Sequence, residues 1–205
     1  MKRLAVVLAV FLVFAVTAGA QGDAARMKPV IYAGGGIGLP LSPSAFSDGW
    51  KMGIGFGGGV GLQVTPYVEV IGKFFFNTFP LDLPEVPGIT TDGGDLRFME
   101  FGADVKYIFT VGPDSPVGPF LLAGAGMANV KVTDFTVSGD GETNTIPFGD
   151  YSETKFALAF GGGFDYMFSP KAGMWVEGRY ALVLTEGDSF GYFPIRVGVK
   201  LLLGE

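Results

Sequence analysis

The sequence predicts an all-β protein, an eight-stranded antiparallel up-and-down β-barrel that crosses a membrane. Eight segments of the 205-residue chain alternate between apolar residues and polar or glycine residues with a period of two. This period is typical of strands whose two faces meet different surroundings. The connections between the segments are alternately short and long, as in transmembrane barrels. Each segment also has about the length that a tilted strand needs to cross hydrocarbon.

The chain begins with the pattern of a secretory signal peptide. Lys2 and Arg3 give it a positive start, residues 4–16 are an uninterrupted apolar run, and Ala18 and Ala20 provide small side chains for cleavage. The apolar run has 13 residues, too few for a membrane-spanning helix. We therefore expect a signal peptide at 1–20, followed by a short N-terminal segment at 21–28 and the β-barrel at 29–205.

The eight segments differ in how clearly their faces separate. In the first two, one face is mostly glycine, as at Gly34 and Gly55, whereas the third and fourth alternate cleanly between apolar and charged residues. The fifth is ambiguous and is oriented only by Asn129 and Lys131. The last three again place charges on one face and aromatic or branched residues on the other. The predicted strands are Val30–Leu39, Gly53–Thr65, Tyr67–Phe76, Arg97–Phe109, Pro119–Lys131, Lys155–Phe168, Met174–Thr185 and Tyr192–Leu203.

The connections predict which ends of the strands lie together. Short turns that contain proline are expected at 65–66, 112–116 and 169–171, and long connections near 40–52, 77–96 and 132–154. The final connection, at 186–191, falls at the long-loop end but is short. Tight turns at one end of an even-stranded barrel and long loops at the other are typical of outer-membrane proteins.

The two faces of the strands predict a lipid-facing exterior and a charged interior. An eight-stranded barrel encloses room for a packed core or one small ligand, which is too little for the many rings on the apolar face. We therefore expect the apolar face to meet lipid and the charged face to form an interior network with a structural role. Its predicted members are Glu69, Lys73, Glu100, Asp104, Lys106, Lys131, Lys155, Asp165, Glu177, Arg179, Arg196 and Lys200.

The predicted interior charges favour a plug over a pore. They comprise five acids and seven bases, and charges buried away from bulk water need opposite partners. The glycines of the first two strands leave room for a gap, unless Trp175, Arg179 and Arg196 lean across it. A narrow conduit therefore stays as the alternative.

The chain resembles the small bacterial outer-membrane barrels of the OmpA and OmpX kind. The resemblance rests on the signal peptide, the eight alternating segments and the openings YAGGGIGLPL and GIGFGGGVGLQVTPYVEV, and it covers about residues 28–205. It implies an outer-membrane location for the β-barrel at 29–205 and a periplasmic location for the short segment at 21–28. It also implies outer-membrane lipid and lipopolysaccharide as surroundings, and the barrel-insertion machinery as a partner during biogenesis.

Composition excludes much of the familiar enzyme chemistry. The chain has no histidine and no cysteine, so it lacks a Ser-His or Cys-His pair, a thiolate nucleophile and the usual zinc ligands. Its net charge of −6 and the scarcity of clustered basic residues argue against a nucleic-acid partner. The G-x-G-x-x-G match at Gly53 continues as a strand, which does not fit a dinucleotide site. We expect no catalytic residues, no cofactor and no metal site.

The connections at 77–96, 132–154 and 186–191 are acidic and contain no lysine or arginine. Their simplest interpretation is a solvated surface. A sharper one is the capture of divalent cations, alone or as bridges to lipopolysaccharide phosphates. An extracellular partner that binds the acidic loops is also compatible with their charge. We expect an outer-membrane β-barrel with a structural or cell-surface interaction role and no catalysis. A narrow conduit for small, even apolar, solutes is the first alternative, and a soluble periplasmic ligand-binding barrel is the second.

Overall fold

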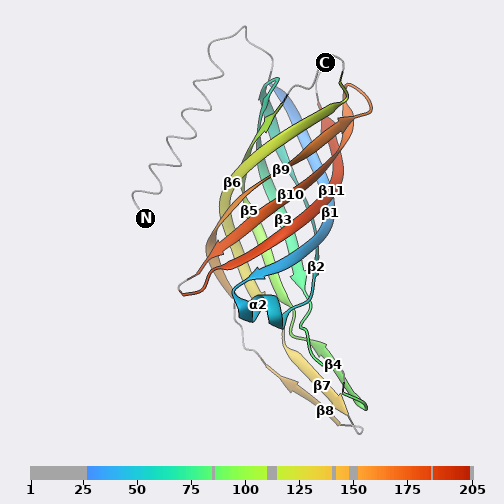
Figure 1. Cartoon of the computed structure of the whole chain (residues 1–205), viewed down its shortest axis with the longest axis vertical. Helices are drawn as coiled ribbons and strands as arrows, with labels where there is room; N and C mark the ends of the chain where they lie inside the picture. The colour runs from blue at the N-terminus through green and yellow to red at the C-terminus, as the bar shows by residue number, and fades with distance from the viewer. Residues whose placement is uncertain are drawn as a thin grey trace.

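The computed structural model describes residues 27–84, 86–109, 115–139, 142–147, 152–185 and 187–203. The predicted signal peptide lies outside the described residues. Eight antiparallel strands close into one barrel, which confirms the predicted fold class (Figure 1). Each predicted strand coincides with one barrel strand. These are β1 (Lys28–Ser42), β2 (Gly53–Thr65), β3 (Val68–Phe79), β5 (Leu96–Ile108), β6 (Val117–Val132), β9 (Ser152–Met167), β10 (Ala172–Leu184) and β11 (Phe190–Leu202).

The barrel follows chain order and closes through β1 and β11. Its strand order is β1-β11-β10-β9-β6-β5-β3-β2, and Ile31 of β1 lies opposite Leu201 of β11 at the closing seam. A closed barrel pairs the backbone groups of every strand on both sides, which a membrane requires. The turn end, with the β2–β3 and β9–β10 turns, and the loop end, with the long connections, lie at opposite ends of the barrel (Figure 1).

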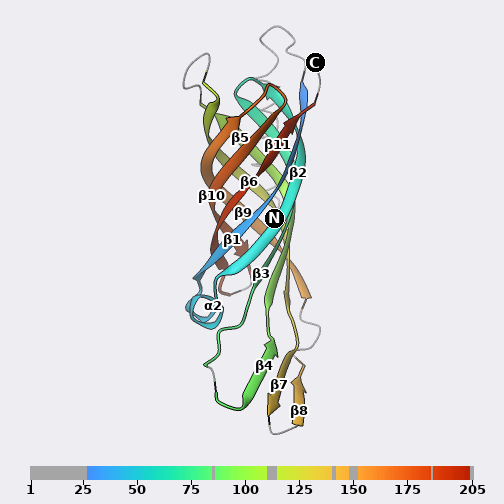
Figure 2. The same ribbon diagram turned by 90° about the vertical axis from the view of Figure 1, so that its right-hand side faces the viewer.

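The long connections contain regular structure that the sequence analysis did not predict. The connection at 40–52 forms a short helix, α2 (Ser44–Gly49). The connections at 77–96 and 132–154 form a three-stranded sheet of β4 (Ile89–Gly93), β7 (Phe135–Gly139) and β8 (Glu142–Ile146), here called the loop sheet. Figure 2 shows the loop sheet extending beyond the loop end of the barrel. Among the described residues, no helix is long and apolar enough to cross a membrane.

Side-chain exposure confirms that the apolar face points outward. Phe56, Val60 and Phe160 are each more than 60% exposed, whereas Glu69 and Arg196 are at most 2% exposed. Successive side chains of a strand point to opposite sides, so this contrast repeats along the strands. An apolar exterior with a polar interior is the arrangement of a membrane barrel. In a soluble ligand-binding barrel the two faces would be exchanged.

The fifth strand faces the opposite way from the prediction. In β6, Phe120 and Leu122 are buried inside the barrel, whereas Leu121 is 58% exposed. Asn129 and Lys131 share the parity of Leu121 and therefore lie on the outer face. The predicted orientation of this strand was wrong because it depended on these two residues, which lie at the loop end of β6, above the apolar band. Polarity at that end reports the membrane boundary and not the barrel interior.

Candidate functional site

Three groups of side chains fill the interior of the barrel between its two ends. The turn-end ion cluster consists of Tyr32, Glu69, Lys106, Asp165 and Lys200. The central ion cluster consists of Lys73, Asn77, Glu100, Asp104, Glu177, Arg179 and Arg196. The loop-end aromatic cluster consists of Phe46, Phe79, Phe98, Phe190 and Tyr192. Together they decide whether the barrel is a plug or a conduit.

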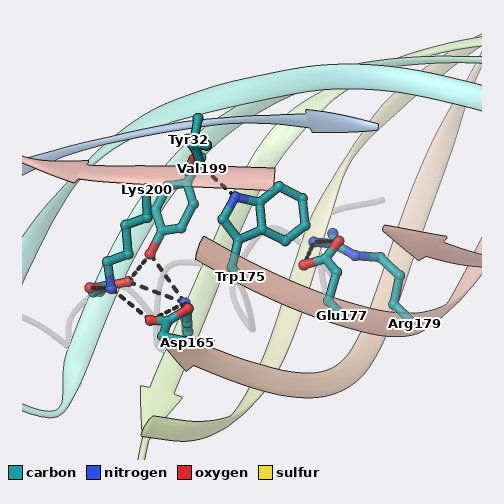
Figure 3. Close-up of polar contacts among 9 residues, drawn as sticks. Tyr32, Asp165, Trp175, Glu177, Arg179, Val199 and Lys200 are labelled. Carbon is teal, nitrogen blue, oxygen red and sulfur yellow. Dashed lines mark hydrogen bonds and ion pairs between the residues drawn. The ribbon is translucent and has the colours of Figure 1, made fainter. Parts of the chain in front are cut away.

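The turn-end ion cluster joins five strands through two lysines. Lys106 Nζ lies 2.7 and 2.8 Å from the two carboxylate oxygens of Asp165 and donates to the Tyr32 hydroxyl over 3.1 Å. Lys200 Nζ lies 2.6 Å from Glu69 Oε1 and 2.7 Å from Asp165 Oδ2 (Figure 3). The Tyr32 hydroxyl donates to the other oxygen of Glu69. Two acids and two bases thus neutralise one another in a buried place, as buried charges require.

Trp175 separates the two ion clusters, as Figure 3 shows. Its indole Nε1 donates to the Val199 carbonyl oxygen over 3.1 Å, and the residue as a whole is only 3% exposed. A methyl group at Gly34 or at Gly198 would lie only 2.6 Å from Trp175 Cζ2. The glycine face of β1 therefore accommodates the indole ring. The gap that the sequence left open is filled here by Trp175.

Arg179 is the centre of one half of the central ion cluster. Its Nη1 lies 2.9 Å from Asp104 Oδ2 and its Nη2 lies 2.6 Å from Glu177 Oε1. Lys73 Nζ lies 2.7 Å from the other oxygen of Asp104. Glu177 and Arg179 come from alternate positions of β10, whereas Asp104 comes from β5 across the barrel. These contacts hold opposite walls of the barrel together.

Arg196 forms the other half of the central ion cluster. Its guanidinium nitrogens lie 3.6 Å from Glu100 Oε1 and 3.7 Å from Glu177 Oε1, and Nη2 donates to Asn77 Oδ1 over 3.2 Å. The Asn77 amide donates in turn to Glu100 over 2.7 Å. The guanidinium carbon lies 3.9 Å from the centre of the Phe75 ring, a cation–π arrangement. Arg196 is thus held by charge, hydrogen bonding and stacking.

The loop-end aromatic cluster closes the barrel toward the loops. Phe46 of α2 is fully buried, and its ring centre lies 5.1 Å from that of Phe79, 6.0 Å from that of Phe98 and 5.5 Å from that of Phe190. The Tyr192 hydroxyl donates to Glu100 and so joins this cluster to the charges below. The short helix therefore covers the mouth of the barrel with an aromatic side chain.

The cavities of the described part of the chain fit a plugged interior. A cavity of about 300 Å³ opens at the turn end, with Gln63 and Met167 in its walls, and reaches Asp165 and Lys200. A second cavity, between the two ion clusters, has only about 30 Å³, which is room for one or two water molecules. The larger cavity therefore penetrates only as far as the turn-end ion cluster.

Ten of the twelve predicted interior charges lie in the two ion clusters, and Lys131 and Lys155 do not. Lys131 is exposed on the outer face of β6. Lys155 has the inward parity but lies at the loop end, where its side chain is 22% exposed and its Nζ is 2.7 Å from Glu153 Oε2. Without these two lysines the clusters contain five acids and five bases. The charges of the buried interior therefore balance.

The interior network also contains uncharged residues that were not among the predicted members. Tyr32, Asn77 and Tyr192 each supply a buried hydrogen-bonding group to a carboxylate. Their parity could have identified them, because Tyr32 shares the face of Gly34 and Tyr192 shares the face of Arg196.

The acidic loops do not assemble a metal site in the described part of the chain. Among those residues, no group of three or more carboxylates is close enough to hold a metal ion. Asp92, Asp134 and Glu142 are exposed and lie on or beside the loop sheet. The cation-capture hypothesis therefore has no geometric support in this region.

An eight-stranded barrel with an apolar exterior, a neutral ion-paired interior and long loops at one end belongs to the small transmembrane barrels of outer membranes. The family model described as the outer membrane protein beta-barrel domain matches residues 6–200, and the chain belongs to this family. The family implies the outer membrane as its location.

Solved structures show the same fold at low sequence identity. Neisserial surface protein A, from Neisseria, is 18% identical with a TM-score of 0.50, over 85% of this chain and 95% of that one. The N-terminal β-barrel domain of Pseudomonas aeruginosa OprF is 15% identical with a TM-score of 0.50, over 89% and 100%. The comparison with curated proteins found no match.

Proposed function

We propose that this protein is a closed, non-catalytic outer-membrane barrel that anchors an interaction surface, the loop sheet, outside the cell. The observation that carries this proposal is the contrast between the two parts of the molecule. The barrel interior is neutral and densely paired and is covered by Phe46, whereas the loop sheet extends freely past the barrel (Figure 2).

The loop sheet supports an interaction role because much of its surface is available. Only β7 is paired on both sides, so β4 and β8 each keep an edge outside any described pairing. Ile89 and Ile146 are 45% and 51% exposed on the same face as Phe135 and Val137. Exposed apolar side chains on an outward extension are characteristic of interaction surfaces. The acidic residues around the sheet favour a partner with basic groups.

The experiment that tests this proposal removes the loop sheet and keeps the barrel. A variant in which short Gly-Ser turns replace residues 83–92 and 134–148 should still fold into the barrel and shift on gels without boiling as the wild type does. Cells that produce this variant should lose attachment to basic surfaces such as polylysine-coated glass, while envelope resistance to detergent stays unchanged. Equal attachment by both forms would contradict the interaction role.

The conduit alternative is tested by conductance. The refolded mature chain should show little steady current in planar bilayers. Each interior charge is paired, and the passage of an unpaired ion through the barrel would have a high free-energy cost. A reproducible open channel of fixed size would contradict the closed barrel and favour the conduit. The turn-end cavity of about 300 Å³ is the feature that such a conduit would use.

A further inference from the structure

Two cations lie directly opposite each other on the outer face of the barrel. In the antiparallel pair of β5 and β6, Arg97 is the register partner of Lys131. Side chains at such positions have Cβ atoms about 4.5–5.5 Å apart, and like charges there destabilise the sheet. An anion between or beside the two cations would relieve their repulsion.

Within the described part of the chain, neither cation is fully neutralised. Among the described residues Lys131 has no ion pair. Arg97 is 44% exposed at its side chain, and only Nη2 contacts a carboxylate, that of Asp95 at 3.3 Å. A guanidinium has five N–H donors, so Arg97 keeps several free for a ligand. The pair therefore retains positive charge and donors on the outer surface.

The register places the pair at the edge of the lipid-facing band. Outward-facing register partners on β3, β5, β6 and β9 form rows across the outer surface. One such row, which consists of Phe74, Phe101, Met127 and Phe156, is wholly apolar. The next row toward the loop end crosses Phe76, Met99, Asn129 and Thr154, and the row after that crosses Thr78, Arg97, Lys131 and Ser152. The outer surface thus changes within two rows from wholly apolar, through a row that is half apolar and half polar, to a row that contains both cations. That boundary at the loop end is where the headgroups of the outer leaflet lie.

We propose that Arg97 and Lys131 form a binding site for a phosphate group of an outer-leaflet lipid. The chemistry fits, because arginine binds phosphate through a planar fork of donors and lysine contributes a second point charge. Lipid, and not a dissolved phosphate ion, is the source because the pair lies within two rows of the wholly apolar row, whose side chains acyl chains would cover. The site neutralises the like-charge pair and fixes the depth of β5 and β6 in the membrane.

The test compares lipid dependence of stability. The mature chain is refolded into phosphatidylcholine vesicles with and without lipopolysaccharide, and its Tm is followed by the loss of β-sheet circular dichroism. Lipopolysaccharide should raise the Tm of the wild type, and the double variant Arg97→Gln, Lys131→Gln should lose most of that rise. The matched control, Lys28→Gln with Lys171→Gln, removes two exposed cations at the turn end and should keep it.

Further arms identify the ligand and its source. Enzymatically dephosphorylated lipopolysaccharide should give no rise, and neither should inorganic phosphate added to phosphatidylcholine vesicles. Retention of lipopolysaccharide by detergent-extracted protein, counted by native mass spectrometry, should fall about ten-fold in the double variant, as expected for the loss of a charge-assisted contact. The Arg97→Lys variant should retain an amount of lipopolysaccharide between that of the wild type and that of the double variant. Because it keeps the charge, it controls for a double variant that fails to fold. An unchanged lipid response in the double variant, or an equal loss in the turn-end control, would overturn the proposal.

Discussion

At the level of single residues, Arg179 shows how the interior charges depend on one another. It lies within hydrogen-bonding distance of carboxylates from two strands, and its side chain is 4% exposed. Removing one partner of a buried ion pair leaves the other partner charged and desolvated. Replacing an exposed partner leaves the other in water, where the cost is small. The same chemical change therefore has different consequences inside and outside the barrel.

We expect Arg179→Ala to lower the free energy of unfolding by about 3–5 kcal/mol, because Asp104 and Glu177 lose their shared cation. The measurement is urea unfolding of the protein refolded into lipid vesicles. Lys51→Ala is the matched control, since Lys51 pairs with Asp82 at 3.3 Å and both side chains are more than half exposed. That change should cost less than about 1 kcal/mol. Similar costs for both variants would argue against a tightly coupled interior.

Gly198 illustrates a steric constraint at the same scale. A methyl group there would lie 2.6 Å from Trp175 Cζ2, so either the indole or the strand must move. We expect Gly198→Ala to destabilise the barrel by about 1–3 kcal/mol, the usual cost of overpacking. Gly72→Ala is the control, because a methyl group there would lie 3.6 Å from its nearest neighbour, the Val60 carbonyl oxygen. Parallel unfolding titrations decide the point, and equal stability of the two variants would contradict it.

At the level of elements, α2 depends on the barrel that it covers. A helix of six residues is too short to be stable alone, and Phe46 is its one buried residue. The following residues are tied to the connections on both sides of β4. The Trp50 indole donates to the Gly94 carbonyl oxygen, between β4 and β5, over 3.0 Å, and the Lys51 amide donates to that of Pro80, between β3 and β4, over 2.8 Å. The position of the helix thus follows from packing and not from helix propensity.

We expect Phe46→Ala to release α2 while the barrel stays folded. Truncation of a buried phenylalanine costs about 3–5 kcal/mol, and here the loss falls on one loop. The measurement is tryptic cleavage after Lys51, which should become much faster than in the wild type. Ala45→Ser, at an exposed position of the same helix, should leave the rate unchanged. If Phe46→Ala resists trypsin as well as the wild type, the ring does not hold the helix.

At the level of the whole molecule, the barrel is closed at two successive depths. The loop-end aromatic cluster covers one mouth, and the two ion clusters span the interior beneath it. The ion clusters link strands that are far apart in the chain, so they close the interior and brace the barrel at once. Opening one of the two closures should therefore leave the other in place.

We expect Phe46→Ala to remain non-conducting in planar bilayers, because the ion clusters still fill the barrel. Adding Arg179→Ala and Arg196→Ala to it should produce ion leakage, since the central carboxylates would then draw in cations and water. The double variant Arg179→Ala, Arg196→Ala with Phe46 intact is the control for the central cluster alone. A steady current through Phe46→Ala itself would show that the aromatic cluster is the only barrier.

The strands and the direction of most faces could be predicted from the sequence because strand alternation is a local property. Glu100 and Phe101, or Arg196 and Val197, differ in polarity at neighbouring positions, and the pleat turns that difference into inside and outside. The signal failed at Lys131, because a cation at the end of a strand has the same appearance whether it faces the interior or the headgroups. Only the register of β6 against its neighbours resolves the two cases.

The alternation of residue types along the chain is enough to predict a barrel whose apolar face meets lipid and whose charged face lies inside. It does not predict which charges meet, that Tyr32 and Tyr192 join them, or that the loops build a helix and a sheet. These features depend on contacts between residues that are far apart along the chain. Lys200 and Glu69 are 131 residues apart, and their contact depends on barrel closure, register and side-chain length together. Local periodicity fixes the face that a side chain occupies, whereas the closed barrel fixes its partner.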